Sequence, residues 1–223
     1  MHDLLTYAIG DAHGCFDKLV RLLGRCRLHA AARPMRLVFI GDYIDRGPES
    51  RAVVEFLIKT QRANPDRVIC LRGNHEAMAL AAAAEGNEME ALWLINGGGQ
   101  TLRSYGVRRA AELPPETLEW FVVLPLSYDD GRRYFVHAGI NPGLALDAQC
   151  EHDQLWIREP FLRHKGDYGR LIVHGHTPLP TGRPDLCPNH LNIDTGAVFG
   201  GPLTAAVFTD TQTAPIDFLN DAD

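Results

Sequence analysis

Residues 36–47 read RLVFIGDYIDRG: an apolar run stops at a glycine and is followed at once by two aspartates and an arginine. The run has the length of a strand, and its continuous apolar character is typical of a strand buried on both faces. Similar runs recur at residues 4–9, 67–71, 132–136, 170–173, 190–193 and 203–208. The sequence therefore predicts a sheet protein whose strands end at Gly, Asp, Asn or His.

Helical periodicity occupies the gaps between the first three runs. Apolar residues follow the i, i+3, i+4, i+7 spacing of one helix face in residues 16–23, and they gather on one side of residues 53–58. Strand–helix–strand alternation predicts βαβ units with parallel pairing in the first half of the chain. The second half has strands with little helix between them, so we expect additional, partly antiparallel strands there.

Residues 77–124 depart from this alternation of strand-like and helix-like segments. The segment is alanine-rich, contains Trp93 and Trp120, and carries a triple-glycine break at 97–99 and a helix start at Pro114–Pro115. We expect a helical cap insertion that either covers one face of the sheet or shapes access for a substrate. The length of 223 residues fits one α/β domain, residues 1–223, that includes this cap.

Polar residues gather where five of the apolar runs end. The clusters are GDAHG at 10–14, GDYIDRG at 41–47, RGNHE at 72–76, HAG at 137–139 and HGH at 174–176. Ligands of open α/β sheets bind outside the carboxyl ends of the strands, so clusters on strands that share a sheet would converge on one site. Burying so many ionisable groups together is costly unless metal ions compensate for it.

The side chains of these clusters have the chemistry of a transition-metal site. The candidate ligands are Asp11, His13, Asp42, Asn74, His137 and His176. They offer carboxylate, carboxamide and imidazole but no thiolate, which suits Mn²⁺, Fe or Zn²⁺ and argues against a Ca²⁺ cage. Six ligands exceed what one tetrahedral ion needs, so we expect two ions that share a carboxylate. Two such ions can acidify a water to hydroxide near neutral pH and clamp the oxygens of an in-line displacement at phosphorus.

Three further residues complete the predicted chemistry. Arg46 is suited to bidentate recognition of a phosphate. His75 is adjacent to Asn74, so we expect it to face the same site without necessarily binding metal. A neighbouring carboxylate such as Asp45 would orient the imidazole and favour its protonated form, ready to protonate a leaving alkoxide.

The ordered set GDAHG, GDYIDRG, RGNHE, HAG and HGHTP resembles the phosphoprotein phosphatase family of binuclear metallophosphoesterases. The segments WLINGG (93–98), LWIRE (155–159) and NIDTGAVFGGPLT (192–204) are most similar to the small bacterial branch typified by the phage lambda protein phosphatase. The resemblance spans roughly residues 6–208. It implies a calcineurin-like metallophosphoesterase fold, an α/β structure with a central β-sandwich of mixed sheets flanked by helices.

The resemblance also implies roles for individual residues. The implied metal ligands are Asp11 and His13 for the first ion, Asp42 as the bridge, and Asn74, His137 and His176 for the second ion. His75 matches the family's general acid, paired with Asp45, while Arg46 and Arg158 match the two arginines that bind phosphate, with Asn74 beside them. Arg158 is not evident from spacing alone. The implied cofactors are two divalent ions, Mn²⁺ first, with Fe or Zn²⁺ as alternatives.

The resemblance favours a hydrolase of phosphoserine and phosphothreonine in proteins, with dual specificity toward phosphotyrosine left open. The alternative in the same fold is a pyrophosphohydrolase that cleaves diadenosine tetraphosphate symmetrically. A remote alternative is a non-catalytic module that binds metal or phosphate.

The composition excludes some classes of binding partner and indicates a cellular compartment. The formal net charge of −6 argues against general nucleic-acid binding. No apolar run is long enough to span a bilayer, and the N-terminus lacks the features of a signal peptide. The five cysteines form no CxxC pair, and we expect Cys15 to be an inert buried thiol and His174 to support a ligand rather than bind metal. We therefore expect a cytoplasmic protein with no membrane partner. The chain is also short beside the eukaryotic enzymes of the family that it resembles, whose grooves bind regulatory subunits, so the resemblance implies no dedicated regulatory subunit.

Overall fold

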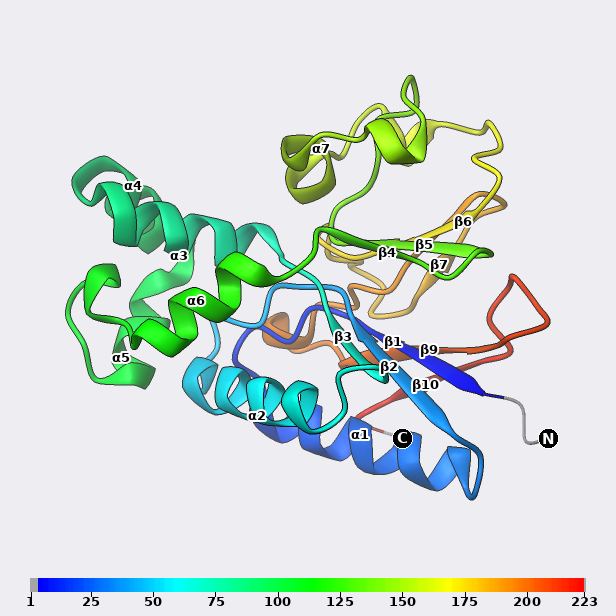
Figure 1. The fold of residues 1–223 in the computed structure, drawn as a ribbon, viewed down its shortest axis with the longest axis horizontal. Coiled ribbons are helices and arrows are strands. Elements are labelled where there is room, and N and C mark those ends of the chain that lie inside the picture. The colour runs from blue at the N-terminus through cyan, green and yellow to red at the C-terminus, as the bar shows by residue number, and fades with distance from the viewer. Residues whose placement is uncertain (1–3, 223) are drawn as a thin grey trace.

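The computed structural model describes residues 4–222, which form two five-stranded sheets flanked by helices (Figure 1). The first sheet has the strand order β10-β9-β1-β2-β3. Its strands are β1 (Leu5–Ile9), β2 (Met35–Phe39), β3 (Val68–Cys70), β9 (Thr204–Thr209) and β10 (Asp217–Asn220). β1, β2 and β3 pair in parallel, whereas β9 pairs antiparallel with β1 and with β10.

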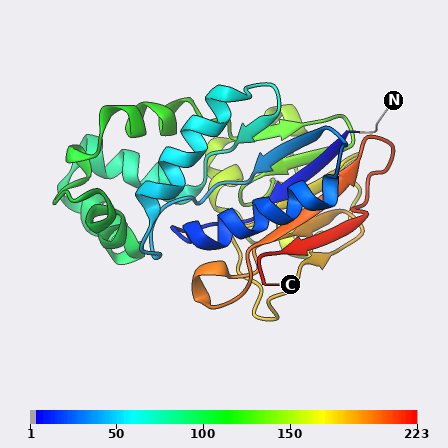
Figure 2. The same cartoon turned by 90° about the horizontal axis from the view of Figure 1, so that it is seen from below.

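Two helices connect the parallel strands of this sheet. α1 (Phe16–Ala30) joins β1 to β2, and α2 (Ser50–Ala63) joins β2 to β3. Each helix buries one apolar face, which includes Leu19 and Leu23 in α1 and Val54 and Leu57 in α2. Figure 2 shows both helices lying across the outer face of the sheet. The βαβ units predicted from the periodicity are confirmed.

The second sheet has the strand order β4-β5-β6-β8-β7. Its strands are β4 (Ser127–Asp129), β5 (Arg133–Val136), β6 (Leu171–His174), β7 (Asp185–Leu186) and β8 (His190–Asn192). β5, β6 and β8 are parallel, and the edge strands β4 and β7 run antiparallel to their neighbours. β4, β7 and β10 were not expected from the sequence, because they are short edge strands with polar or exposed residues.

The two sheets pack face to face. Their shared core contains Val38 and Phe208 from the first sheet and Phe135, Val173 and Leu191 from the second, all fully buried. The polar clusters therefore do not all follow strands of one sheet, which was the condition for convergence stated above. Three clusters follow β1, β2 and β3, and two follow β5 and β6 of the other sheet.

Helices make up the regular structure between residues 74 and 123 and gather at one end of the sandwich (Figures 1 and 2). They are α3 (Asn74–Glu85), α4 (Asn87–Trp93), η1 (Leu94–Gly98), α5 (Gly99–Tyr105), η2 (Ala110–Glu112) and α6 (Pro115–Val123). The remaining helical turns are η3 (Leu146–Ala148), α7 (Glu151–Trp156), η4 (Phe161–Arg163) and η5 (Ala197–Phe199). Within residues 4–222, no helix is long and apolar enough to cross a bilayer.

Candidate metal centre

The loops that follow β1, β2, β3, β5 and β6 meet at one place, and the six predicted ligands are all buried there. The His176 backbone N–H donates to Asp11 Oδ2 at 3.0 Å, which joins the loop after β6 to the loop after β1. His176 Nδ1 lies 2.9 Å from Asn74 Oδ1, at the first residue of α3. The sandwich therefore brings together side chains from both sheets, although the sheets share no strand.

Asp42 lies between two histidines, one on each of its oxygens. His13 Nε2 is 3.3 Å from Asp42 Oδ2, and His137 Nε2 is 3.3 Å from Asp42 Oδ1. The other ring nitrogen of each histidine faces a backbone carbonyl: His13 Nδ1 is 2.8 Å from Ile44 O, and His137 Nδ1 is 3.0 Å from Ile40 O. A carbonyl only accepts, so Nδ1 carries the ring proton in both residues.

Burial disfavours the charged form of both of these histidines. Burial lowers the pKa of His13 to about 3, against the opposing charge of Asp42, and it lowers the pKa of His137 as well. The Nε2 lone pairs therefore point at a carboxylate, and His137 Nε2 also lies 2.8 Å from Asn74 Oδ1. At His137, acceptors that face acceptors repel one another unless a cation lies between them, whereas His13 Nε2 also has the Arg46 Nη1 donor 2.6 Å away. The donor set and its geometry thus fit divalent metal.

Two buried atoms of predicted ligands, out of nine such side-chain atoms in residues 4–222, lack a hydrogen-bond partner. They are Asp11 Oδ1 and His176 Nε2. Burial, together with the charges of Asp194 and Asp42, raises the pKa of Asp11, and burial lowers the pKa of His176 to about 2. Unsatisfied buried polar atoms are rare in folded proteins and commonly mark an ion or a water. Two groups of residues have ligand atoms within 4.8 Å of one another, His13–Asp42–His75 and Asp42–His137–His176, and Asp42 belongs to both.

His75 and Asp45 form the predicted pair. His75 Nδ1 lies 2.7 Å from Asp45 Oδ2, and both residues are buried. The other ring nitrogen, Nε2, lies 3.9 Å from Asp42 Oδ2. Burial opposes protonation of His75, but the carboxylates of Asp42 and Asp45 outweigh it and raise the pKa of this imidazole. The pair can therefore hold a proton at the edge of the metal cluster.

The two arginines occupy different environments. Arg46 Nη1 lies 2.6 Å from His13 Nε2, and its guanidinium stands 5.4 Å from the ring centroid of Phe199, which is 63% exposed. Arg158 is exposed in the loop after α7, and its side chain makes no hydrogen bond within residues 4–222. Burial is the main cause of the lowered pKa of His176, and the charges of His137 and, to a smaller extent, Arg158 lower it further. Arg46 thus contacts a predicted ligand directly, whereas Arg158 makes no side-chain hydrogen bond to the cluster.

The backbone at this site is strained. Five of its residues have a left-handed φ without being glycine: His13 (41°), Asp42 (55°), Asp45 (72°), Arg46 (67°) and His176 (64°). Elsewhere in residues 4–222, only Ala31 and Asn87 share this property among non-glycine residues. Each such residue costs on the order of 1–3 kcal/mol of conformational free energy. The left-handed backbone at these residues orients their side chains in directions that regular strand geometry does not allow.

Two buried carboxylates of the site had no role in the sequence-based predictions. Glu76, the last residue of RGNHE, accepts hydrogen bonds from backbone N–H groups of the loop that carries Asp42. Asp194 accepts from the Gly196 N–H at 3.1 Å, and burial raises its pKa to about 6. Asp194 follows β8 as Asp11 follows β1, so the rule that ligands lie at strand ends would have included it.

Cys15 and His174 lie near the site without joining it. Burial raises the pKa of the Cys15 thiol, whose Sγ donates weakly to His13 O at 3.7 Å. His174 is fully buried beside Phe161 and His190, and burial lowers its pKa to about 3. Its Nδ1 donates to Gly175 O at 3.1 Å, a hydrogen bond to the backbone rather than to a ligand.

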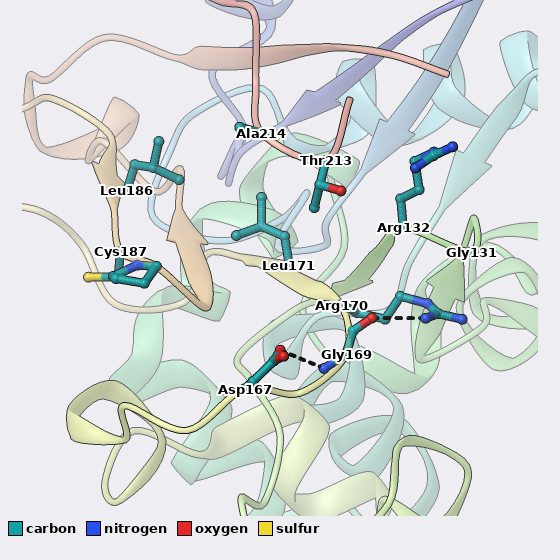
Figure 3. Close-up of a pocket in the computed structure, with 11 residues that line it drawn as sticks. Gly131, Arg132, Asp167, Gly169, Arg170, Leu171, Leu186, Cys187, Thr213 and Ala214 are labelled. Carbon is teal, nitrogen blue, oxygen red and sulfur yellow. Dashed lines mark hydrogen bonds between the residues drawn. The ribbon is translucent and has the colours of Figure 1, made fainter. Parts of the chain in front are cut away.

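A hollow of about 740 Å³ opens at the opposite edge of the second sheet (Figure 3). It includes Leu171, at the start of β6, whereas the metal cluster follows the end of that strand. Asp167 accepts from the Gly169 N–H and Arg170 donates to Gly169 O, so these charged groups serve the local turn. None of the predicted site residues lines this hollow.

Comparison with known proteins agrees with this geometry. The family described as calcineurin-like phosphoesterase matches residues 4–208. Serine/threonine-protein phosphatase 1 of Salmonella typhimurium is 35% identical over 212 residues, covering 90% of each chain. Bis(5'-nucleosyl)-tetraphosphatase PrpE (asymmetrical) of Anoxybacillus flavithermus is 27% identical over 93% of this chain and 92% of its own. The solved cold-active protein-tyrosine phosphatase of a psychrophilic Shewanella has a TM-score of 0.62 at 18% identity, covering 94% of this chain and 82% of its own.

Proposed function

Because the chain belongs to the calcineurin-like phosphoesterase family, we propose that it hydrolyses phosphoserine and phosphothreonine in proteins in a metal-dependent reaction. The observation that carries the chemistry is Asp42, which has an imidazole Nε2 3.3 Å from each of its oxygens. The protein-level substrate is supported by the Salmonella relative, which this chain matches over 90% of both lengths.

Six side chains would hold two divalent ions. Asp11 and His13 would bind the first ion, Asn74, His137 and His176 the second, and Asp42 both. All six are buried, and the ligand atoms of Asp42, His137 and His176 lie within 4.8 Å of one another. The ions would supply positive charge at the phosphoryl oxygens and a more acidic water. The absence of thiolates in this set favours Mn²⁺, Fe or Zn²⁺.

The chain's own residues would bind the phosphoryl group and move the proton. The Arg46 guanidinium, beside His13, offers paired donors to two phosphoryl oxygens. His75 would hold a proton on Nε2 and donate it to the departing alkoxide, while Asp45 accepts a hydrogen bond from Nδ1–H and fixes the ring. A single in-line displacement of this kind inverts the configuration at phosphorus, so retention measured with a chiral phosphate would exclude it.

A substrate comparison tests the proposal. The Mn²⁺-loaded protein is assayed on a phosphoserine peptide and on diadenosine tetraphosphate, with the Asp42→Asn variant as a control for contaminating phosphatase. We expect a higher kcat/KM for the peptide. A strong preference for the dinucleotide would favour the second candidate instead.

That second candidate is a dinucleoside tetraphosphatase, and it is supported by the Anoxybacillus relative, which matches 93% of this chain. The name of that relative gives asymmetrical cleavage, whereas the alternative drawn from the sequence was symmetrical cleavage. It requires the same metals and acid and differs in what the surrounding loops recognise. If p-nitrophenyl phosphate were not hydrolysed with Mn²⁺, Fe²⁺ or Zn²⁺, both hydrolase proposals would fail and a non-catalytic binding role would replace them.

A further inference from the structure

Two residues besides His75 donate hydrogen bonds to the Asp45 carboxylate. Trp93 Nε1 donates to Asp45 Oδ2 at 2.7 Å, the same oxygen that His75 Nδ1 approaches at 2.7 Å. Thr101 Oγ1 donates to the other oxygen, Oδ1, at 2.6 Å. The Asp45 backbone N–H donates back to Thr101 Oγ1 at 2.9 Å. Asp45, Trp93 and Thr101 are all fully buried, so no solvent replaces these contacts.

Both donors come from the helical segment rather than from the sheets. Trp93 is the last residue of α4, and Thr101 lies in α5. They are 48 and 56 residues away from Asp45 in sequence. The helices that were expected either to cover a sheet face or to shape substrate access thus reach the carboxylate that orients His75.

The glycines that follow Trp93 fit the same arrangement. A Cβ at Gly98 would lie 2.5 Å from Cδ2 of the Trp93 indole, so this close packing requires glycine. Gly97 has a φ of 107°, and its carbonyl accepts from the Arg46 N–H at 3.2 Å. A Cβ there would lie 2.8 Å from Arg46 Cγ. The segment WLINGG therefore docks on the dipeptide Asp45–Arg46.

We propose that Trp93 and Thr101 are positioning residues for the leaving-group proton transfer and act through Asp45. This inference rests on the proposed function, in which His75 is the acid. A carboxylate with a donor on each oxygen has a fixed plane, and the imidazole bonded to it has a fixed direction. Partners of this kind, one step removed from the reacting group, typically contribute 10–100-fold to activity.

The test uses substrates whose leaving groups differ. Proton donation matters for the alkoxide of a phosphoserine peptide and matters little for 2,4-dinitrophenolate, which leaves without help. Trp93→Phe removes one N–H and Thr101→Val removes one O–H with little change of shape. We expect each to lower kcat on the peptide by about 10–100-fold, with KM unchanged and kcat on 2,4-dinitrophenyl phosphate close to wild type. Thr101→Ser, which keeps the hydroxyl, should restore peptide turnover.

Matched controls lie in α6, another helix of the same segment. Trp120 is also buried, but its Nε1 donates to Gln61 Oε1 at 2.7 Å, and Thr117 contacts the Tyr105 hydroxyl at 3.3 Å. Trp120→Phe and Thr117→Val should change both substrates alike and only slightly. If Trp93→Phe fails to fold, the comparison of Thr101→Val with Thr101→Ser carries the test alone.

His75→Asn, assayed in parallel, separates the two proposals. In that background, Trp93→Phe should cause no further loss on the peptide, because both substitutions remove the same assistance. If His75→Asn loses peptide turnover selectively and the Trp93 and Thr101 variants do not, the inference is wrong while the proposed function stands. An equal loss on both substrates would likewise overturn it, because that result indicates a general structural role. If His75→Asn itself shows no selectivity, the acid assignment in the proposed function fails first.

Discussion

Replacing Glu76 with glutamine tests whether a buried carboxylate organises the loop that carries Asp42. Glu76 is fully buried in the first turn of α3. Its Oε1 accepts from the backbone N–H groups of Tyr43 at 2.8 Å and Ile44 at 3.3 Å. Its Oε2 accepts from those of Gly73 at 2.9 Å and Asp42 at 3.0 Å. Four donors thus converge on one side chain.

Glutamine has almost the same shape, but an NH₂ group replaces one of the two oxygens. Whichever way the amide turns, two backbone N–H groups lose their acceptor and face another donor. An unsatisfied buried donor costs about 1–3 kcal/mol, so two of them should lower the free energy of unfolding by about 2–6 kcal/mol. That is a large share of the roughly 5–15 kcal/mol that holds a typical domain folded.

Urea unfolding followed by tryptophan fluorescence measures this difference. The experiment is done in the presence of a chelator, because metal that binds only the folded state would add its own stabilisation. Glu85→Gln is the matched control, since Glu85 is the exposed last residue of the same helix. We expect the control to stay within about 0.5 kcal/mol of wild type.

Two results would refute this reasoning. One is a Glu76→Gln protein whose unfolding midpoint and slope match those of wild type, which would mean that the loop keeps its shape without the carboxylate. The other is an equal loss in Glu76→Gln and Glu85→Gln, which would trace the effect to helix α3 in general rather than to the four hydrogen bonds.

Three further outcomes are expected. His75→Asn should lower kcat on a phosphoserine peptide by about 10²–10⁴-fold while the metal content, measured by elemental analysis, stays at the wild-type value. Asp42→Asn should lose both ions, so Mn²⁺ should raise the Tm of chelator-treated wild type but not of this variant; an unchanged stoichiometry would contradict its bridging position. Phe199→Ala removes an exposed ring 5.4 Å from the Arg46 guanidinium, a contact worth about 0.5–1 kcal/mol. Because the Arg46 guanidinium then loses this contact, KM for a phosphoserine peptide should rise modestly, and the free energy of unfolding should fall by no more than that amount. An unaltered KM would show that the ring does not position Arg46.

The amino-acid sequence by itself determined the βαβ units and the identity of the clustered side chains. Both depend on local patterns: an apolar run that stops at a polar residue marks a strand end, and the spacing of apolar residues marks a helix face. Asp11 and Asp42 were found because they follow β1 and β2 directly. The same rule extends to Asp194 after β8, so that carboxylate was also within reach of the sequence.

Only the tertiary structure decided which strands share a sheet and which distant groups meet. The pairing of β5 with β6 rather than with β3 depends on hydrogen bonds between segments far apart in the chain. Glu76 accepts from four N–H groups, and Asp45 accepts from Trp93 and Thr101. These contacts depend on loop closure and on left-handed backbone at single residues. No local pattern encodes such contacts, because their free energy comes from burial and hydrogen bonding that exist only once the elements have packed.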